Sequence, residues 1–271
     1  MPRIDDIFAT LRAGNRKALM PFLCGGHPAR GDLGRLIPAL ESAGASVIEV
    51  GIPFSDPIAD GPVIAAAMHD ALQAGATPAS VFEEIAEVRP RVRCGLVAMV
   101  SVSIVHRMGG PAAFMGQAAK AGFDGFIIPD APLEESGDLA DAAREAGTTL
   151  SLLIAPTTPP ERAAQIAKAS TGFVYLLTRS GITGEQSKVP DVSAPVRAIR
   201  EATDLPIACG FGISTREQVR AVVAHADAAI VGSGLVRRIS EAGKAGRDPV
   251  VDAKVFLGQL ASGLPNGAAA R

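Results

Sequence analysis

The stretch EVGIPFSDPIADGP, residues 49–62, opens on an acidic residue where the preceding pattern favours an apolar one. Ser46–Gly51 is a predicted strand, and the two-residue period of a strand places Val47, Glu49 and Gly51 on one face. Acidic side chains are rarely fully buried, because removing a carboxylate from water is costly and raises its pKa toward neutrality. A carboxyl group with such a pKa can both give and take protons, so Glu49 is a candidate acid–base residue.

Two further acidic residues, Asp56 and Asp60, follow Glu49 in a loop rich in proline and glycine. This loop can bring both carboxylates over the same site as Glu49. For Asp56, ordinary turn chemistry beside a proline explains the residue equally well. A structural ion pair with a buried lysine or arginine is the alternative for Glu49. The predicted strands contain neither residue type, which makes that alternative the weaker one.

Two glycine-rich turns indicate a phosphate-binding site. Gly210–Ser214 follows the seventh predicted strand, Gly232–Gly234 follows the eighth, and each opens a predicted helix. Backbone N–H groups at such turns and at helix N-termini bind phosphate without needing a lysine. Thr178–Gly184 is a candidate third contributor, and its continuation to residue 190 has the composition of a lid loop. The alternative is that these glycines only permit tight turns.

The scaffold that must position these residues is predicted from alternating strand and helix patterns. The eight predicted strands are Ala18–Cys24, Ser46–Gly51, Leu96–Ser101, Gly125–Pro129, Thr149–Ala155, Phe173–Thr178, Leu205–Cys209 and Ala228–Gly232. Eight β-α units favour an α/β fold, a (β/α)8 TIM barrel, over a doubly wound sheet. Active sites of such barrels lie at the carboxyl ends of the strands, where Glu49 and the glycine turns fall.

Additional helices are expected around this barrel. The segment before the first strand has Ile4, Ile7, Phe8 and Leu11 on one helical face, and the stretch between strands two and three is long enough for two helices. We expect one barrel domain over residues 1–262. Residues 263–271 are small and polar and are expected to fray.

Composition excludes several functional classes. Of 271 residues, 48% are hydrophobic and 20% charged, and the net charge of −2 provides no basic face for nucleic acid. No apolar run reaches the roughly 20 residues of a membrane span, and no secretory signal is present, so we expect a cytoplasmic protein. Three cysteines without C-x-x-C spacing and four scattered histidines indicate neither disulfides nor a metal site. His27 is a candidate supporting group behind the site, or, more readily, a solvated loop histidine.

Five motifs, in order over nearly the whole chain, resemble those of one known family. They are IEVGIPFSDPIADGPVI, GFDGFIIPDAPLEE, YLLTRSGITGEQ, DLPIACGFGIS and AIVGSG, and the family is the tryptophan synthase alpha chain. The resemblance implies a (β/α)8 barrel and a lyase of tryptophan biosynthesis that cleaves indole-3-glycerol phosphate to indole and glyceraldehyde 3-phosphate. It also implies that this chain holds no cofactor. The expected partner is a pyridoxal-phosphate beta chain in an α2β2 heterotetramer.

Carried over position by position, the resemblance makes Glu49 the catalytic acid–base and Asp60 the second catalytic carboxylate. The positions that it places around indole or phosphate are Phe22, Tyr175, Thr183, Gly184, Phe211, Gly212, Gly232 and Ser233. Indole cannot leave as a carbanion, so ring carbon C3 must be protonated while a carboxylate stabilises the proton on N1, a task suited to Asp60. A base must also take the proton of the neighbouring glycerol hydroxyl, a task suited to Glu49.

The chain departs from the family pattern after the third predicted strand. Met99–Met108 stands where the family usually has an aromatic pair and Asn-Pro. That region is expected to contact the substrate ring and the beta chain. Other interpretations therefore stay open: a stand-alone lyase that releases indole, a regulatory phosphate-binding subunit of low activity, or an unrelated phosphosugar isomerase or epimerase.

Overall fold

The computed structural model describes residues 1–57, 60–178, 191–210 and 212–265. These residues contain nine short strands, all parallel, in one sheet of order β5-β4-β3-β2-β1-β9-β8-β7-β6. The strands are β1 (Ala18–Cys24), β2 (Val47–Gly51), β3 (Gly95–Met99), β4 (Gly125–Ile127), β5 (Thr149–Ser151), β6 (Leu153–Ile154), β7 (Val174–Leu177), β8 (Ile207–Gly210) and β9 (Ala228–Val231).

The two edges of this sheet belong to one stretch of chain, because only Leu152 separates β5 from β6. β5 pairs with β4 and β6 pairs with β7, so the stretch joins the edges and the sheet is a nearly closed barrel. The predicted (β/α)8 barrel is confirmed, and its fifth predicted strand, Thr149–Ala155, is divided into these two short pieces.

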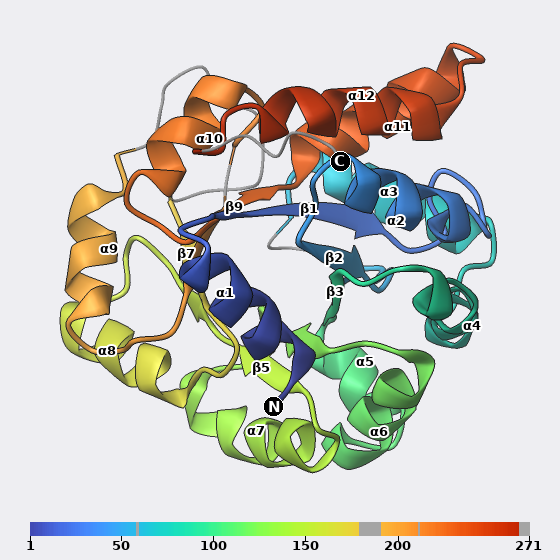
Figure 1. Cartoon of the computed structure of the whole chain (residues 1–271). Helices are drawn as coiled ribbons and strands as arrows, with labels where there is room; N and C mark the ends of the chain where they lie inside the picture. Colours follow the sequence, from blue (N-terminus) through green and yellow to red (C-terminus); the bar gives the residue numbers. More distant parts are fainter. Residues whose placement is uncertain (58–59, 179–190, 211, 266–271) are drawn as a thin grey trace.

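Helices surround the barrel and alternate with its strands (Figure 1). In the described residues they are α1 (Arg3–Ala13), α2 (Leu33–Ser42), α3 (Pro62–Gln73), α4 (Pro78–Val88), α5 (Val102–Arg107), α6 (Pro111–Ala121), α7 (Ser136–Glu145), α8 (Pro160–Ala169), α9 (Ser193–Arg200), α10 (Arg216–Val223), α11 (Ser233–Lys244) and α12 (Pro249–Ala261). The predicted N-terminal helix and the two predicted helices between strands two and three are confirmed as α1, α3 and α4. None of these described helices is long and apolar enough to cross a membrane.

Helix α1 closes the amino-terminal end of the barrel (Figure 1). Its Ile4, Phe8 and Leu11 are buried and belong to the cluster that fills the barrel interior, together with Val47 and Phe173. The outward faces of the strands pack against the surrounding helices in a second, larger cluster. The barrel is therefore packed and closed at this end, so a site within it can open only at the carboxyl ends of the strands.

Asp124 links the amino-terminal ends of β3 and β4. Its Oδ2 accepts hydrogen bonds from the Leu96 N–H at 2.8 Å and from Arg89 Nη1 at 2.9 Å. Arg89 also donates to the carbonyl oxygens of Val92 and Cys94, at 2.8 and 2.9 Å. Asp124 thereby links β3, β4 and the segment that leads into β3.

Asp227 repeats this arrangement before β9, across the barrel from β4 in the strand order. It accepts a hydrogen bond from the Ile207 N–H at 3.0 Å and another from Arg200. Arg200 also donates to the carbonyl oxygen of Leu205 at 3.1 Å. Each aspartate thus precedes one strand, binds the N–H of the neighbouring strand, and shares an arginine with backbone carbonyls.

Asp124→Ala is expected to lower the free energy of unfolding by about 3 kcal/mol, because it leaves the part-buried guanidinium of Arg89 and the Leu96 N–H without their acceptor. Asp141→Ala is the matched control, since Asp141 forms an exposed ion pair with Arg144 and its loss should change stability by less than about 0.5 kcal/mol. Urea unfolding of both variants checks this. Equal losses in the two variants would contradict it.

Candidate active site

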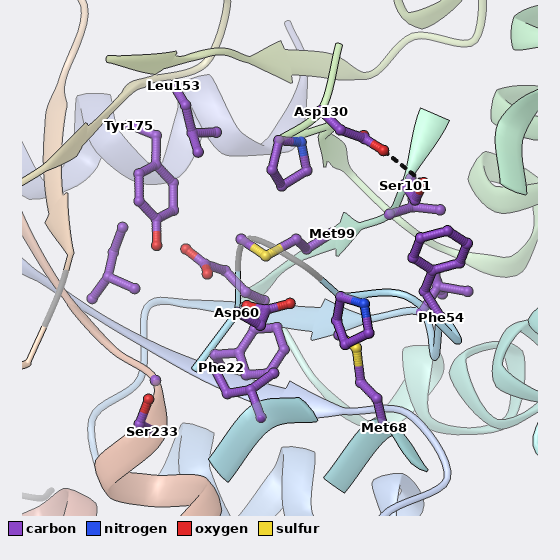
Figure 2. Close-up of a pocket in the computed structure, with 18 of the residues that line it drawn as sticks. Phe22, Phe54, Asp60, Met68, Met99, Ser101, Asp130, Leu153, Tyr175 and Ser233 are labelled. Atoms are coloured by element: carbon purple, nitrogen blue, oxygen red, sulfur yellow. Dashed lines mark hydrogen bonds between the residues drawn. The ribbon is translucent and has the colours of Figure 1, made fainter. Parts of the chain in front are cut away.

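One pocket lies at the carboxyl ends of the strands and collects most of the described candidate residues. Figure 2 shows Tyr175, Met99 and Asp60 directed into the same space, with Ser233 on one side. Ser101 and Asp130 lie on the other side. The pocket lining includes a glycine-rich end at Ser233 and an apolar part formed by aromatic and aliphatic side chains.

Glu49 lines this pocket from β2, where it pairs in register with Phe22 of β1 and Val97 of β3. Its side chain is fully buried, and within the described residues neither carboxyl oxygen has a hydrogen-bond partner. Val47, two residues earlier, belongs to the inner cluster, as the predicted alternation requires. Burial raises the pKa of Glu49 well above its usual value, because it disfavours the charged carboxylate. The ion-paired alternative is not supported by any described contact.

Asp60 reaches the same pocket from the loop after β2. It is partly buried, and burial raises the pKa of its carboxyl to about 6. Asp56 also lines the pocket, but it is exposed and accepts a hydrogen bond from the Ser55 hydroxyl at 2.8 Å, which is turn chemistry. The two loop aspartates thus differ: Asp60 is the one whose partial burial raises its pKa into a range useful for proton transfer.

Phe22 and Tyr175 form the aromatic part of the pocket wall. Both are nearly buried, at 3% and 8% exposed. Burial raises the pKa of Tyr175, and the charges of Glu49, Asp60 and Cys209 raise it further. The phenol therefore stays neutral and lies near both candidate carboxyl groups.

The glycine-rich end of the pocket is formed by Gly212, Gly232 and Ser233. Gly232 is the N-cap of α11 and Ser233 its first residue, which leaves the N–H groups of Ser233 and Gly234 without an acceptor inside the helix. The Ser233 hydroxyl is buried and has no partner within the described residues. Backbone N–H groups, a helix N-terminus and a hydroxyl together favour an anion such as phosphate.

Helix α10, after the other glycine turn, differs from α11. Its N-terminus is occupied by its own capping box, in which Thr215 Oγ1 accepts from the Gln218 N–H and the Gln218 side chain accepts from the backbone of Ser214 and Thr215. Of the two helices that follow the glycine-rich turns, α11 is therefore the one whose N-terminus remains open to an anion. Phe211, Thr183 and Gly184 lie outside the described residues, and so does the predicted lid up to residue 190.

The unusual segment Met99–Met108 forms the end of β3 and the short helix α5. Met99 and Ser101 line the pocket. Asp130 accepts hydrogen bonds from the Ser101 hydroxyl at 2.6 Å and from the Val102 N–H at 2.8 Å, so it caps α5 from the end of β4 (Figure 2). Sequence reasoning did not single out Asp130. Its position directly after a predicted strand, in Ile-Pro-Asp, was the available signal.

His27 is buried, so its interpretation as a solvated loop histidine is wrong. It is 6% exposed, its Nε2 lies 2.8 Å from the Ser240 hydroxyl, and its Nδ1 has no described partner. The loop after β1 is packed against α11, which removes the ring from water. Burial lowers its pKa, while the charge of Asp70 raises it by a smaller amount. His27 is not among the residues that line the pocket.

Metal and thiol chemistry receive no support from the described residues. No three His, Cys, Asp or Glu side chains gather there as a metal site. The three cysteines are free and buried. Acid–base chemistry is what this pocket can perform with its own groups.

Comparisons with known proteins all identify the same family. A family model described as tryptophan synthase alpha chain matches residues 8–264. The tryptophan synthase alpha chain of Acaryochloris marina is 44% identical over 244 residues, covering 89% of this chain and 91% of the relative. That of Chloroflexus aggregans is 42% identical over 264 residues, covering 97% and 98%.

Solved structures give the same answer. Tryptophan synthase subunit alpha from Legionella pneumophila superposes with a TM-score of 0.88 at 32% identity, covering 97% of this chain and 98% of that one. A chain of Mycobacterium tuberculosis tryptophan synthase superposes with a TM-score of 0.87 at 32% identity, covering 96% and 97%.

Proposed function

Because the chain belongs to the tryptophan synthase alpha chain family, we propose that Glu49 and Asp60 carry out its cleavage of indole-3-glycerol phosphate. Membership of the family makes the chain a lyase of tryptophan biosynthesis. The products of the proposed reaction are indole and glyceraldehyde 3-phosphate, formed by a retro-aldol break of one carbon–carbon bond.

The burial of Glu49 supports its role as the proton carrier. A protonated Glu49 gives its proton to C3 of the indole ring, which makes the ring a leaving group. As the bond from C3 to the glycerol chain breaks, the carboxylate takes the proton of the adjacent hydroxyl, an aldehyde forms, and Glu49 is protonated again. Burial favours the protonated acid that starts this cycle, and it makes the carboxylate formed within the cycle a stronger base for the hydroxyl proton.

Asp60 suits the complementary task. Protonation of C3 leaves positive charge on the ring, and an ionised carboxylate near N1 stabilises that charge. With a pKa of about 6, Asp60 is mostly ionised at neutral pH, whereas the complete burial of Glu49 favours its protonated form. Two carboxyl groups in one pocket thus have different protonation states, as an acid–base mechanism needs.

The observation that carries this proposal is the buried, unpaired carboxyl of Glu49 in the same pocket as the open N-terminus of α11. The test is direct: purified protein is mixed with indole-3-glycerol phosphate and indole is measured. Release of indole supports the proposal. An absence of indole with the substrate intact would refute it.

Ser233→Ala is expected to raise KM for the phosphorylated substrate about tenfold with a smaller effect on kcat, because the hydroxyl contacts a group that does not react. Ser136→Ala is the matched control: Ser136 is also a buried serine at the start of a helix, but its hydroxyl donates to the Leu133 carbonyl away from the pocket. Steady-state kinetics of both variants check this. A similar KM in both variants would show that the Ser233 hydroxyl does not contribute to phosphate binding.

A beta chain is the proposed partner, in an α2β2 assembly, and pyridoxal phosphate is assigned to that chain. Support comes from the family itself and from the pocket, which opens at the face where Met99–Met108 lies. Indole formation should therefore be measured with and without a tryptophan synthase beta chain. Rate enhancement supports the assembly, whereas an unchanged rate and no co-purification favour a stand-alone lyase.

A further inference from the structure

The pocket wall combines two kinds of side chain. Phe22 and Tyr175 are aromatic, while Met68 and Met99 are thioethers; we call Met68 and Met99 the methionine pair. Figure 2 shows Met99 extending into the pocket from β3 and Met68 rising toward it from α3. The acid–base proposal above uses neither methionine.

The aromatic rings are held firmly, because each fills the space of an absent side chain. A Cβ added at Gly51 would lie 2.5 Å from Phe22 Cζ, and one added at Gly210 would lie 2.8 Å from the Tyr175 hydroxyl oxygen. Both glycines are at the ends of strands, in the rigid frame of the barrel. Phe22 and Tyr175 therefore have little freedom to move away from a bound ring.

The methionine pair differs from the rings in side-chain flexibility rather than in burial, since Met68 is itself only 5% exposed. The Met68 methyl carbon would lie 3.5 Å from the same added Cβ at Gly51, an ordinary van der Waals contact. Met99 pairs in register with Gly51, is only partly buried, and packs against both the barrel interior and the cluster that contains Phe22 and Met68. Unbranched thioether side chains adapt their conformation to the shape of what they contact.

We propose that the methionine pair is a specificity-determining element that lets the pocket accept indole rings with substituents on the benzene ring. This inference rests on the proposed function. Phe22 and Tyr175 would fix the ring plane, whereas Met68 and Met99 would give way to a methyl group or halogen. A pocket with four rigid walls would reject the same addition by a factor of about ten or more.

The test compares binding of indole and of 5- and 6-methylindole to the full-length protein, with its methionine methyl groups labelled with ¹³C. The chain has six methionines, so each methyl signal can be assigned by substitution. We expect the Met68 and Met99 signals to shift with every ligand. Those of the fully buried Met20 and Met115 should stay in place. The three dissociation constants should agree within about threefold.

The double variant Met68→Leu/Met99→Leu keeps the side-chain volume nearly constant but introduces branched, stiffer side chains. We expect it to bind indole measurably and to bind the methylindoles about tenfold more weakly relative to indole than the wild type does. Met108→Leu is the matched control, since Met108 lies at the end of α5 and packs against the outer cluster rather than the pocket. It should leave the ratio unchanged.

Two outcomes would overturn the inference: methylindoles that the wild type already rejects, or a double variant with an unchanged ratio. Turnover of indole-3-glycerol phosphate by the wild type is measured in parallel. Failure of that turnover counts against the proposed function, whereas failure of the binding ratio counts against the methionine pair alone.

Discussion

Glu49→Gln is expected to lower kcat for indole formation by at least about a thousandfold, because glutamine can neither protonate C3 nor accept the hydroxyl proton. The two side chains have nearly the same shape, so the pocket around Phe22 should be unchanged. Indole release is the measurement. Glu84→Gln is the matched control: Glu84 is a half-buried carboxyl outside the pocket that accepts from the Leu33 N–H, and its loss should leave kcat within about twofold.

The same variant separates catalysis from folding. Burial raises the folded-state pKa of Glu49 above the unfolded value near 4.5, so between these two values the native state binds more protons than the unfolded chain. The stability of the wild type therefore falls as the pH rises through that interval, whereas a glutamine at this position does not titrate. Thermal unfolding should show the variant gaining on the wild type from about pH 4.5 upward. Near-normal indole release by a folded variant would refute the assigned role.

Asp60→Asn should lower kcat/KM by about a hundredfold and should also change the shape of the pH profile. In the wild type, kcat/KM should fall below about pH 6, because the ionised Asp60 that stabilises the ring cation becomes protonated. It should fall again at high pH, where Glu49 loses the proton that it must donate. The variant cannot titrate at position 60, so its low-pH limb should disappear.

Asp56→Asn tests whether this limb belongs to Asp60. Asp56 is an exposed residue of the same loop, and its carboxylate accepts a hydrogen bond from Ser55. Its loss should weaken the turn and change kcat/KM by less than about fivefold, with the low-pH limb retained. A low-pH limb that persists in Asp60→Asn and vanishes in Asp56→Asn would reverse the assignment.

Strand positions could be predicted from sequence because each strand is a short apolar run between turn residues. β1 has the predicted bounds, and Glu49 stands out only because its neighbours along β2 are apolar. The division at Leu152 was not predictable, because it depends on how the fifth strand must bend to pair with β4 on one side and β7 on the other. The pattern of apolar and polar residues along this strand does not indicate where it must bend.

The remaining parts of the site depend on tertiary contacts. Met68 lies on the apolar face of α3 and is indistinguishable in sequence from a core residue. His27 follows two glycines, which suggests a solvated turn, and only the packing of that loop against Ser240 of α11 buries it. The difference between α10 and α11 as anion sites is local instead: Thr215 and Gln218 have the spacing of a capping box, so the sequence did carry this signal.

Asp124 and Asp227, at the amino-terminal ends of the strands, affect how the barrel unfolds locally. Asp124 secures the Leu96 amide, and Asp227 secures the Ile207 amide, four strands away. Each half of the sheet thus has its own aspartate–amide hydrogen bond. Loss of one of these hydrogen bonds should increase hydrogen–deuterium exchange in its own half of the sheet rather than throughout the barrel. In Asp124→Ala, the Leu96 amide should exchange much faster while the Ile207 amide stays protected, so the two halves of the barrel would behave as separable units of cooperativity.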